Sequence, residues 1–247
     1  MRNVIFLPGI IAPAAARYAP LLTHLSNINR VLKELEIYSH DTPPRDYSIA
    51  LEVRGVERVA DEAGYEAFHL YGHSGGGAIA LAYAAAHPGR VLSLAVDEPA
   101  YDFTDGMRAD MAEFAPLALL PVDKRMRAFM MLQVSPAVAL PPPPEGPPPP
   151  WMAKRPAGID AFVVALENHE RLETQYGAVR APVLFTWGSL THPRWNTMRQ
   201  RLEKLLPDFT SRCFDGLHHL NTSHQAEPER VAAMLDDFWT RAEITLS

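Results

Sequence analysis

Cysteine is nearly absent from this sequence of 247 residues, in which Cys213 is the only one. No disulfide can therefore form within the chain, and we expect Cys213 to pack in the interior. Cationic segments are lacking as well: the net charge is -6 at pH 7, with no basic run and no strongly cationic amphipathic helix. Surfaces that bind nucleic acid or lie on membranes are usually basic, so we expect neither partner.

Long apolar runs are also missing. No stretch approaches the ~18 uninterrupted apolar residues of a membrane-spanning helix. The apolar residues near the N-terminus are broken by Pro8-Gly9, which favours a buried first strand followed by a turn. A secretion signal with a small-residue cleavage site at 14–16 is the alternative interpretation. With the strand preferred, we predict a soluble, cytoplasmic protein.

What the sequence does contain is alternation between short apolar segments and longer helical patterns, with 47% hydrophobic residues to fill a core. Such alternation predicts an α/β fold with a mostly parallel central sheet flanked by helices. Strands are expected at 3–7, within 31–38, and at 67–70, 91–96, 183–187 and 209–214. Helices are expected at 13–26, 48–63, 75–86 and 194–206 and from Pro228 onward.

The alternation stops between about residues 101 and 180. We predict that this segment is a helical and proline-rich cap inserted into a single domain of residues 1–247. The proline run 141–150 favours a stiff strap with Trp151 as its anchor, while an exposed polyproline ligand for a partner is the alternative. The Met and aromatic side chains of the segment, Met107 and Met111 among them, either line an apolar pocket or simply pack the cap onto the core.

The segment Gly72-His73-Ser74-Gly75-Gly76 fits the pattern G-x-S-x-G. It follows an apolar strand and precedes a helix rich in Gly and Ala, and a turn this sharp exposes the serine hydroxyl. The Gly75 N–H at the start of the helix would face a developing oxyanion. A Gly-rich turn without chemistry is the plain alternative. A phosphate-binding loop would need a Lys-Ser or Lys-Thr ending or a G-x-G-x-x-G pattern, and neither is present.

With this motif the chain resembles the α/β-hydrolase superfamily over nearly its full length. The segment Leu7-Pro8-Gly9-Ile10 looks like the His-Gly-x loop after the first main strand of that family, with Pro8 where histidine is usual. The resemblance implies the Ile10 N–H as a second oxyanion donor and a histidine between the last strand and the last helix. A serine at this turn counts against the dehalogenase and epoxide-hydrolase relatives, which use an aspartate there. The hydrolase reaction that the resemblance implies needs no cofactor.

Two adjacent histidines, His218 and His219, occupy the place that the resemblance gives to the base. A serine hydroxyl is a poor nucleophile until a base takes its proton. The spacing to the following helix start favours His219, and His218 stays possible. We expect no metal, because the candidate ligands for a zinc site match no familiar spacing. Those candidates are His192, His218, His219 and His224.

A carboxylate is missing where the resemblance would place the third member of a triad. Thr191 stands at about that position, after the strand at 183–187. The preceding strand ends in Asp97-Glu98, where some family members, including a group of haloalkane dehalogenases, carry their acid. Because side chains alternate along a strand, the two cannot both point inward. Glu98 aligns better, and Asp97 is the next choice. Other candidates are Asp102, Asp105 or no acid at all.

These patterns predict a serine hydrolase that cleaves a carboxylic ester or related acyl bond of a small, apolar substrate. Ser74 would be the nucleophile, His219 the base and Glu98 the acid that orients it. The N–H groups of Gly75 and Ile10 would hold the oxyanion. Thioesterases, lactonases, C–C hydrolases and cofactor-free haloperoxidases share this constellation, so the reaction subtype stays open. A ligand-binding protein that kept the fold without catalysis is the third alternative.

Overall fold

The computed structural model describes residues 1–100, 114, 116–117, 119–142, 145–169 and 173–246. Six parallel strands form one sheet in the order β2-β1-β3-β4-β5-β6. The predicted α/β fold with a parallel sheet is therefore confirmed. The strands are β1 (Arg2–Leu7), β2 (Ile28–Leu32), β3 (Phe68–His73), β4 (Val91–Asp97), β5 (Val183–Gly188) and β6 (Phe209–Phe214).

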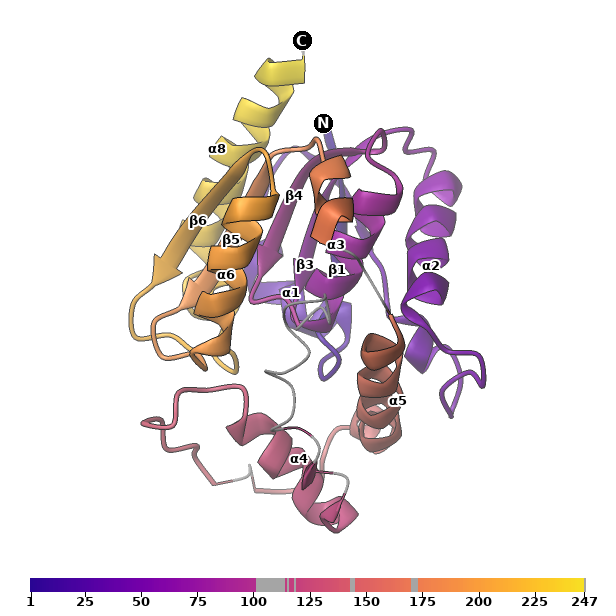
Figure 1. Ribbon diagram of the computed structural model, residues 1–247, viewed down its shortest axis with the longest axis vertical. Coiled ribbons are helices and arrows are strands. Elements are labelled where there is room, and N and C mark those ends of the chain that lie inside the picture. Colours follow the sequence, from indigo (N-terminus) through magenta and orange to yellow (C-terminus); the bar gives the residue numbers. More distant parts are fainter. Residues whose placement is uncertain (101–113, 115, 118, 143–144, 170–172, 247) are drawn as a thin grey trace.

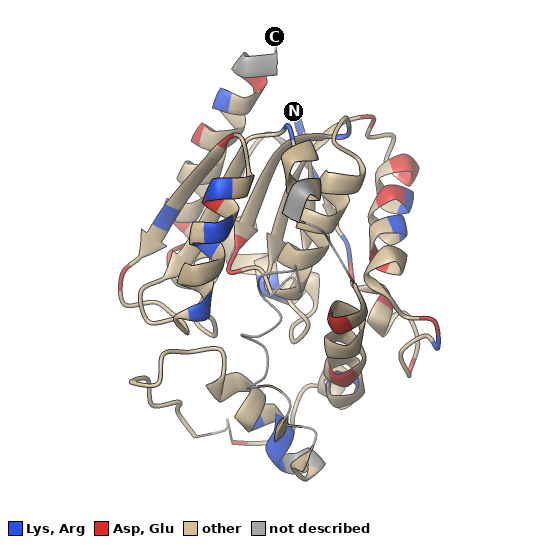
Figure 2. Ribbon diagram, viewed as in Figure 1, with Lys and Arg blue, Asp and Glu red and all other residues tan. Residues whose placement is uncertain are grey.

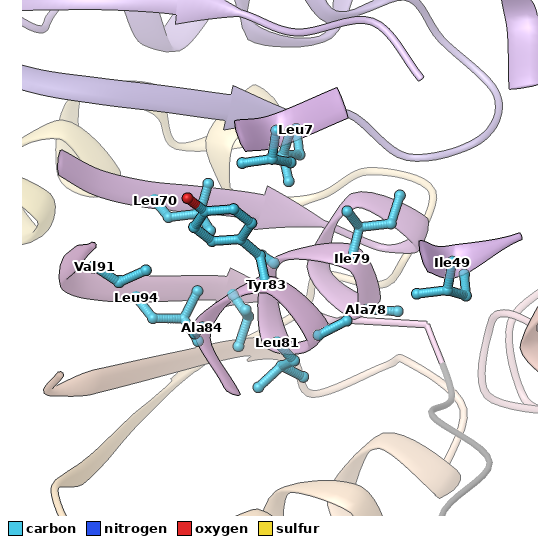
Figure 3. Packing of buried hydrophobic residues seen from close by; sticks show 14 of the residues in the cluster. Leu7, Ile49, Leu70, Ala78, Ile79, Leu81, Tyr83, Ala84, Val91 and Leu94 are labelled. Carbon is cyan, nitrogen blue, oxygen red and sulfur yellow. The ribbon is translucent and has the colours of Figure 1, made fainter. Parts of the chain in front are cut away.

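Helices cover both faces of this sheet (Figure 1). Buried side chains of α2, α3 and α6 pack on one face, and those of α1 and α8 pack on the other. Figure 3 shows α3 side chains such as Leu81 and Tyr83 in the same cluster as Leu70 of β3. The helices are α1 (Ala14–Leu22), α2 (Ile49–Glu62), α3 (Gly75–Ala86), α6 (Arg194–Leu205), the short α7 (Ser223–Ala226) and α8 (Pro228–Leu246).

The second strand lies earlier than predicted. It spans Ile28–Leu32, and residues 36–38 form a short 3-10 turn, η1 (Glu36–Tyr38). The Ile37 N–H donates to the Glu52 carboxylate at 3.2 Å instead of joining the sheet ladder. Ile37 is nonetheless fully buried, so the apolar pattern that suggested a strand reflects packing in the core rather than strand pairing.

Cys213 is exposed, so the expectation that it packs in the interior is wrong. It lies on β6, one of the two edge strands of the sheet, where the neighbouring Arg212 is exposed too and Phe214 is buried. The sequence places Cys213 in the last strand, but it does not show whether that strand lies at the edge or in the centre of the sheet.

Between β4 and β5 the described residues form helices and no strand pairs with the sheet. Figure 1 places α4 and α5 beyond the carboxyl ends of the strands. The described residues of the proline run 141–150 are exposed, and its role as a strap or as a ligand stays a prediction, as does the single-domain cap. Met107 and Met111 lie outside the described residues. The elements here are α4 (Val122–Met131), η3 (Pro150–Lys154), α5 (Arg155–Asn168) and η4 (Glu173–Ala178).

Charged residues of both signs are interspersed along α2 and α6 (Figure 2). Among the helices that the structure describes, none combines the length and the apolar character needed to cross a bilayer.

Candidate active site

Ser74 lies at the turn from β3 into α3 with φ 52° and ψ −121°. A non-glycine residue with positive φ is strained, and such strain is characteristic of a serine at a nucleophile turn. The turn is possible because its neighbours lack side chains. A Cβ at Gly72 would come within 2.5 Å of the Gly76 carbonyl oxygen, and one at Gly76 within 2.3 Å of the Leu7 carbonyl oxygen.

Of the two candidate histidines, the structure brings His219 to Ser74. Its Nε2 lies 2.9 Å from Ser74 Oγ, and the side chain is buried in the loop between β6 and α7. The ring of Trp195 stacks on the His219 ring, with centroids 4.6 Å apart. His218 instead accepts the backbone N–H groups of Leu220 and Asn221 at its Nδ1, so its ring organises the loop.

Of the candidate carboxylates, Glu98 reaches this histidine. Its Oε2 lies 2.7 Å from His219 Nδ1. The Gly188 N–H donates to Oε1 at 2.7 Å, and the Thr191 hydroxyl donates to Oε2 at 3.1 Å. Glu98 directly follows β4 and has φ 44°, so the chain leaves the strand geometry there. With Nδ1–H donated to this acceptor, the lone pair on Nε2 faces Ser74 Oγ.

Asp97 points into a different cluster beneath these residues. Its Oδ2 lies 3.0 Å from His224 Nδ1, and the hydroxyls of Thr186 and Ser223 donate to Oδ1 at 2.6 and 3.2 Å. Through its backbone carbonyl, Asp97 also accepts the Ser74 N–H at 3.1 Å. The cluster thus supports the turn that carries Ser74, and Glu98 rather than Asp97 is hydrogen-bonded to His219. Asp102 and Asp105 lie outside the described residues.

The ring of His73 contacts both the group of Ser74, His219 and Glu98 and the cluster around Asp97. Its centroid lies 5.0 Å from the centroids of both His219 and His224. Within the described ranges, Nδ1 or Nε2 of His73 and His224 and a carboxylate oxygen of Asp97 form one set of possible metal ligands within 4.8 Å of one another. An ion there would have to displace the hydrogen bond between His224 and Asp97, and the expectation of no metal stays a prediction.

The two expected oxyanion donors lie side by side. Gly75 is the first residue of α3, so its N–H is not used by the helix ladder. A Cβ on Gly75 would lie 2.6 Å from Ile10 Cγ2, which places the Ile10 segment against the start of the helix. The Tyr38 hydroxyl donates to the Ile10 carbonyl at 2.6 Å and thereby fixes the orientation of this loop.

Burial is the largest single influence on the pKa values of His219, Glu98 and Asp97, although for Asp97 other contributions together outweigh it. It lowers the pKa of His219 to about 3; the negative charge of Asp97 opposes this shift, and Arg17 and Arg194 add to it. Burial also raises the pKa of Glu98 well above its usual range, with the charge of Asp97 adding to that effect. For Asp97, burial raises the pKa, but hydrogen bonds from His224 and His73 outweigh it and the net pKa is lowered. The imidazole of His219 is therefore neutral at pH 7 and able to accept a proton.

A cavity opens at Ser74. Its space for solvent is about 40 Å³, room for only a few waters, so a larger ligand requires lining side chains to move apart. Most of the lining is apolar, and it combines residues of the insertion with residues of α6. The lining residues are Ile10, Ser74, Ala100, Phe114, Phe129, Gln133, Phe162, Val163, Leu166, Arg194 and Trp195.

Sequence reasoning missed two side chains of this site. Trp195 lies in the helix expected at 194–206, but that pattern does not indicate that its Nε1 donates to the Pro99 carbonyl at 2.7 Å while its ring covers His219. His224 was considered only as a zinc ligand. In the sequence, Trp195 closely follows residues 188–193, and His224 closely follows the two adjacent histidines. This proximity points to the two residues, but the sequence does not show which separate loops come into contact.

Comparison with known proteins gives a consistent result at two levels. The family model described as the alpha/beta hydrolase fold matches residues 38–225, well over half of the chain. No curated protein sequence matches.

Several solved structures share the fold at low sequence identity. Proline iminopeptidase from Mycobacterium smegmatis is 20% identical with a TM-score of 0.69, covering 100% of this chain and 91% of the other. For naproxen esterase from Bacillus subtilis the identity is 17%, the TM-score 0.63 and the coverage 96% and 83%. An α/β hydrolase enzyme from a deep-sea metagenome library is 14% identical, with a TM-score of 0.72 and coverage of 97% and 89%. At these identities the likeness shows the fold alone.

Proposed function

The chain belongs to the α/β-hydrolase fold family, and from this premise we propose that it is a serine hydrolase that cleaves a carboxylic ester through an acyl-enzyme. One observation carries the proposal: the unbroken contacts from Ser74 Oγ to His219 Nε2 at 2.9 Å and from His219 Nδ1 to Glu98 Oε2 at 2.7 Å. A hydroxyl, a neutral imidazole and a carboxyl group in this order are the parts that activate a serine.

In the first half-reaction Ser74 Oγ bonds to the ester carbonyl carbon, and its proton passes to His219 Nε2. The electron pair of the C=O bond moves onto the oxygen, where the Gly75 and Ile10 N–H groups stabilise the charge. The tetrahedral intermediate then collapses. The bond to the alcohol oxygen breaks, and the leaving alcohol takes the proton from His219.

In the second half-reaction water replaces the alcohol. Its oxygen bonds to the acyl carbon while His219 Nε2 accepts one of its protons. The second tetrahedral intermediate collapses, the bond to Ser74 Oγ breaks, and Oγ recovers its proton from His219. Glu98 stays hydrogen-bonded to Nδ1 throughout, so it holds the ring in one orientation and stabilises the charged imidazolium.

The apolar lining of the cavity supports an ester with an apolar acyl or alcohol portion. Thioester, lactone and other acyl substrates would pass through the same steps, and the lining rather than the triad would select among them. A panel of esters and thioesters of different chain length separates these subtypes.

Labelling with a fluorophosphonate, read by intact mass, tests the proposal. Such compounds react with activated serines, so wild type is expected to gain a single adduct that the Ser74→Ala variant does not form. A folded wild-type protein that forms no adduct and hydrolyses no ester in the panel would contradict the proposal and favour a ligand-binding role.

A further inference from the structure

A buried arginine lines the same cavity as Ser74. Arg194 is the first residue of α6, and only 5% of it is exposed. Its guanidinium carbon lies 4.6 Å from the ring centroid of Phe114 and 5.5 Å from that of Trp195. Among the described residues that line the cavity, it is the one with a charged side chain.

The charge of Arg194 reaches the reacting groups. The next residue, Trp195, stacks directly on His219, and the positive charge of Arg194 contributes to lowering the pKa of His219. Arg194 therefore lies on the side of the cavity where His219 lies.

A guanidinium at an apolar cavity wall is suited to an anionic group. Its five N–H donors form a planar fork that matches a carboxylate, so a contact within the protein does not exhaust its donors. Contacts with two aromatic rings, those of Phe114 and Trp195, restrict where the fork can turn.

The charge balance near Ser74 favours an anion of one negative charge. The carboxyl groups of Asp97 and Glu98 are both buried; the backbone carbonyl of Asp97 accepts the Ser74 N–H, and Glu98 contacts the His219 ring that faces Ser74. A dianion such as a phosphate monoester would add strong repulsion from Asp97, whereas a carboxylate adds only a single charge.

We propose that Arg194 forms a carboxylate subsite of this cavity, so that the substrate is an ester or related acyl compound that also carries a free carboxylate. The inference rests on the proposed function and specifies its substrate class. The ester carbonyl reaches Ser74 while the carboxylate pairs with the guanidinium, and the chain between the two groups lies against the apolar lining.

The test compares monomethyl esters of straight-chain dicarboxylic acids with the corresponding methyl ester monoamides, which have the same shape without the charge. For wild type at the best chain length, kcat/KM is expected to be about 10- to 100-fold higher for the acid than for the amide. Arg194→Met should remove most of that preference by raising KM for the acid. Arg194→Lys, which keeps the charge but loses the fork, should retain part of it.

Arg199→Met is the matched control, because Arg199 lies on the same helix but pairs with Glu203 at 2.8 Å and contacts Trp187, outside the cavity. It should leave the preference unchanged. Inhibition of wild type by the monoamides of dicarboxylic acids, which keep one carboxylate, compared with the uncharged diamides of the same length, provides a second measurement that needs no variant, and the monoamides are expected to inhibit more strongly.

Equal kcat/KM for acid and amide at every chain length would overturn the inference. An equal loss on both substrates in Arg194→Met would also overturn it, because that result is expected of a purely structural arginine. These results differ from failure of the proposed function, in which wild type hydrolyses neither series and Ser74 takes up no fluorophosphonate.

Discussion

Thr191 donates its hydroxyl to the Glu98 carboxylate at 3.1 Å, and the same Glu98 oxygen contacts His219. Thr191 follows β5, where the family resemblance would place an acid, and Glu98 follows β4, the neighbouring strand. Both strands are parallel and end at the same edge of the sheet, so a carboxylate on either one can reach the same imidazole. The threonine thus supports the carboxyl group that we propose as the acid of the triad.

Replacing Glu98 tests whether this carboxylate orients the base. Glu98→Gln keeps the size of the side chain but removes the acceptor that fixes the proton on Nδ1 of His219. We expect kcat to fall by roughly 10²–10⁴-fold with the fold retained, because an amide in place of a triad acid holds the histidine in the wrong tautomer. Steady-state kinetics on a neutral ester measures it, with the exposed Glu203→Gln as control. Unchanged activity would show that Glu98 is not the acid.

Moving the carboxylate to the neighbouring strand should restore part of that loss. In Glu98→Gln/Thr191→Asp the new carboxylate starts from a position already in contact with residue 98 and close to His219. We expect kcat at least about tenfold above that of the single Glu98→Gln variant. In the wild-type background, Thr191→Asp should instead reduce stability, since it buries a second carboxylate beside Glu98. A double variant no better than Glu98→Gln would argue against interchangeable strand ends.

The acid limb of the pH profile should lie low. His219 acts as a base only when neutral, and burial lowers its pKa to about 3, so activity present at pH 7 is lost only as the pH falls far below the usual imidazole value of about 6.5. We expect the midpoint of the acid limb of kcat/KM at least one pH unit below that value. Circular dichroism at each pH separates titration from unfolding. A midpoint at or above 6.5 would contradict the lowered pKa of His219.

The positions of Ser74 and His219 could be predicted because their signals are local. A G-x-S-x-G segment between a strand and a helix fixes the serine, and spacing to the last helix selected His219 over its neighbour. The choice between Asp97 and Glu98 is harder to predict, because it depends on a backbone turn with φ 44° at Glu98. No residue pattern in the sequence indicates this turn. Arg194 and its partners across the cavity depend on how an insertion packs, which no periodicity encodes.

Asp97 should matter more for stability than for chemistry. Its carboxylate is buried and accepts hydrogen bonds from Thr186, Ser223 and His224. Asp97→Asn removes the charge that these donors stabilise, and we expect the free energy of unfolding to fall by about 3 kcal/mol. Urea denaturation at pH 7 measures it. A variant as stable as wild type would show that the cluster does not need the charge.

The pH dependence of stability gives a further check on Asp97. Its pKa is lower in the folded protein than in the unfolded chain, so its contribution is present above the unfolded value of about 3.9 and is lost as the pH falls below it. The gap in unfolding free energy between wild type and Asp97→Asn should therefore narrow on acidification from pH 7 toward pH 3. A gap that stays constant or widens would contradict this assignment.

The strained backbone at Ser74 can be measured separately from catalysis. Ser74→Ala and Ser74→Gly both remove the nucleophile, but only glycine adopts φ 52° without a steric penalty. Glycine also makes the unfolded chain more flexible, which normally lowers stability. The control is Ala233→Gly at an exposed position of α8, where we expect glycine to lower the free energy of unfolding by about 1 kcal/mol. At residue 74 the sign should reverse, with Ser74→Gly about 1 kcal/mol more stable than Ser74→Ala. If urea denaturation instead gave the same loss at both positions, the turn would store no strain, and its conformation would have to be maintained by the packing of Gly72 and Gly76 alone.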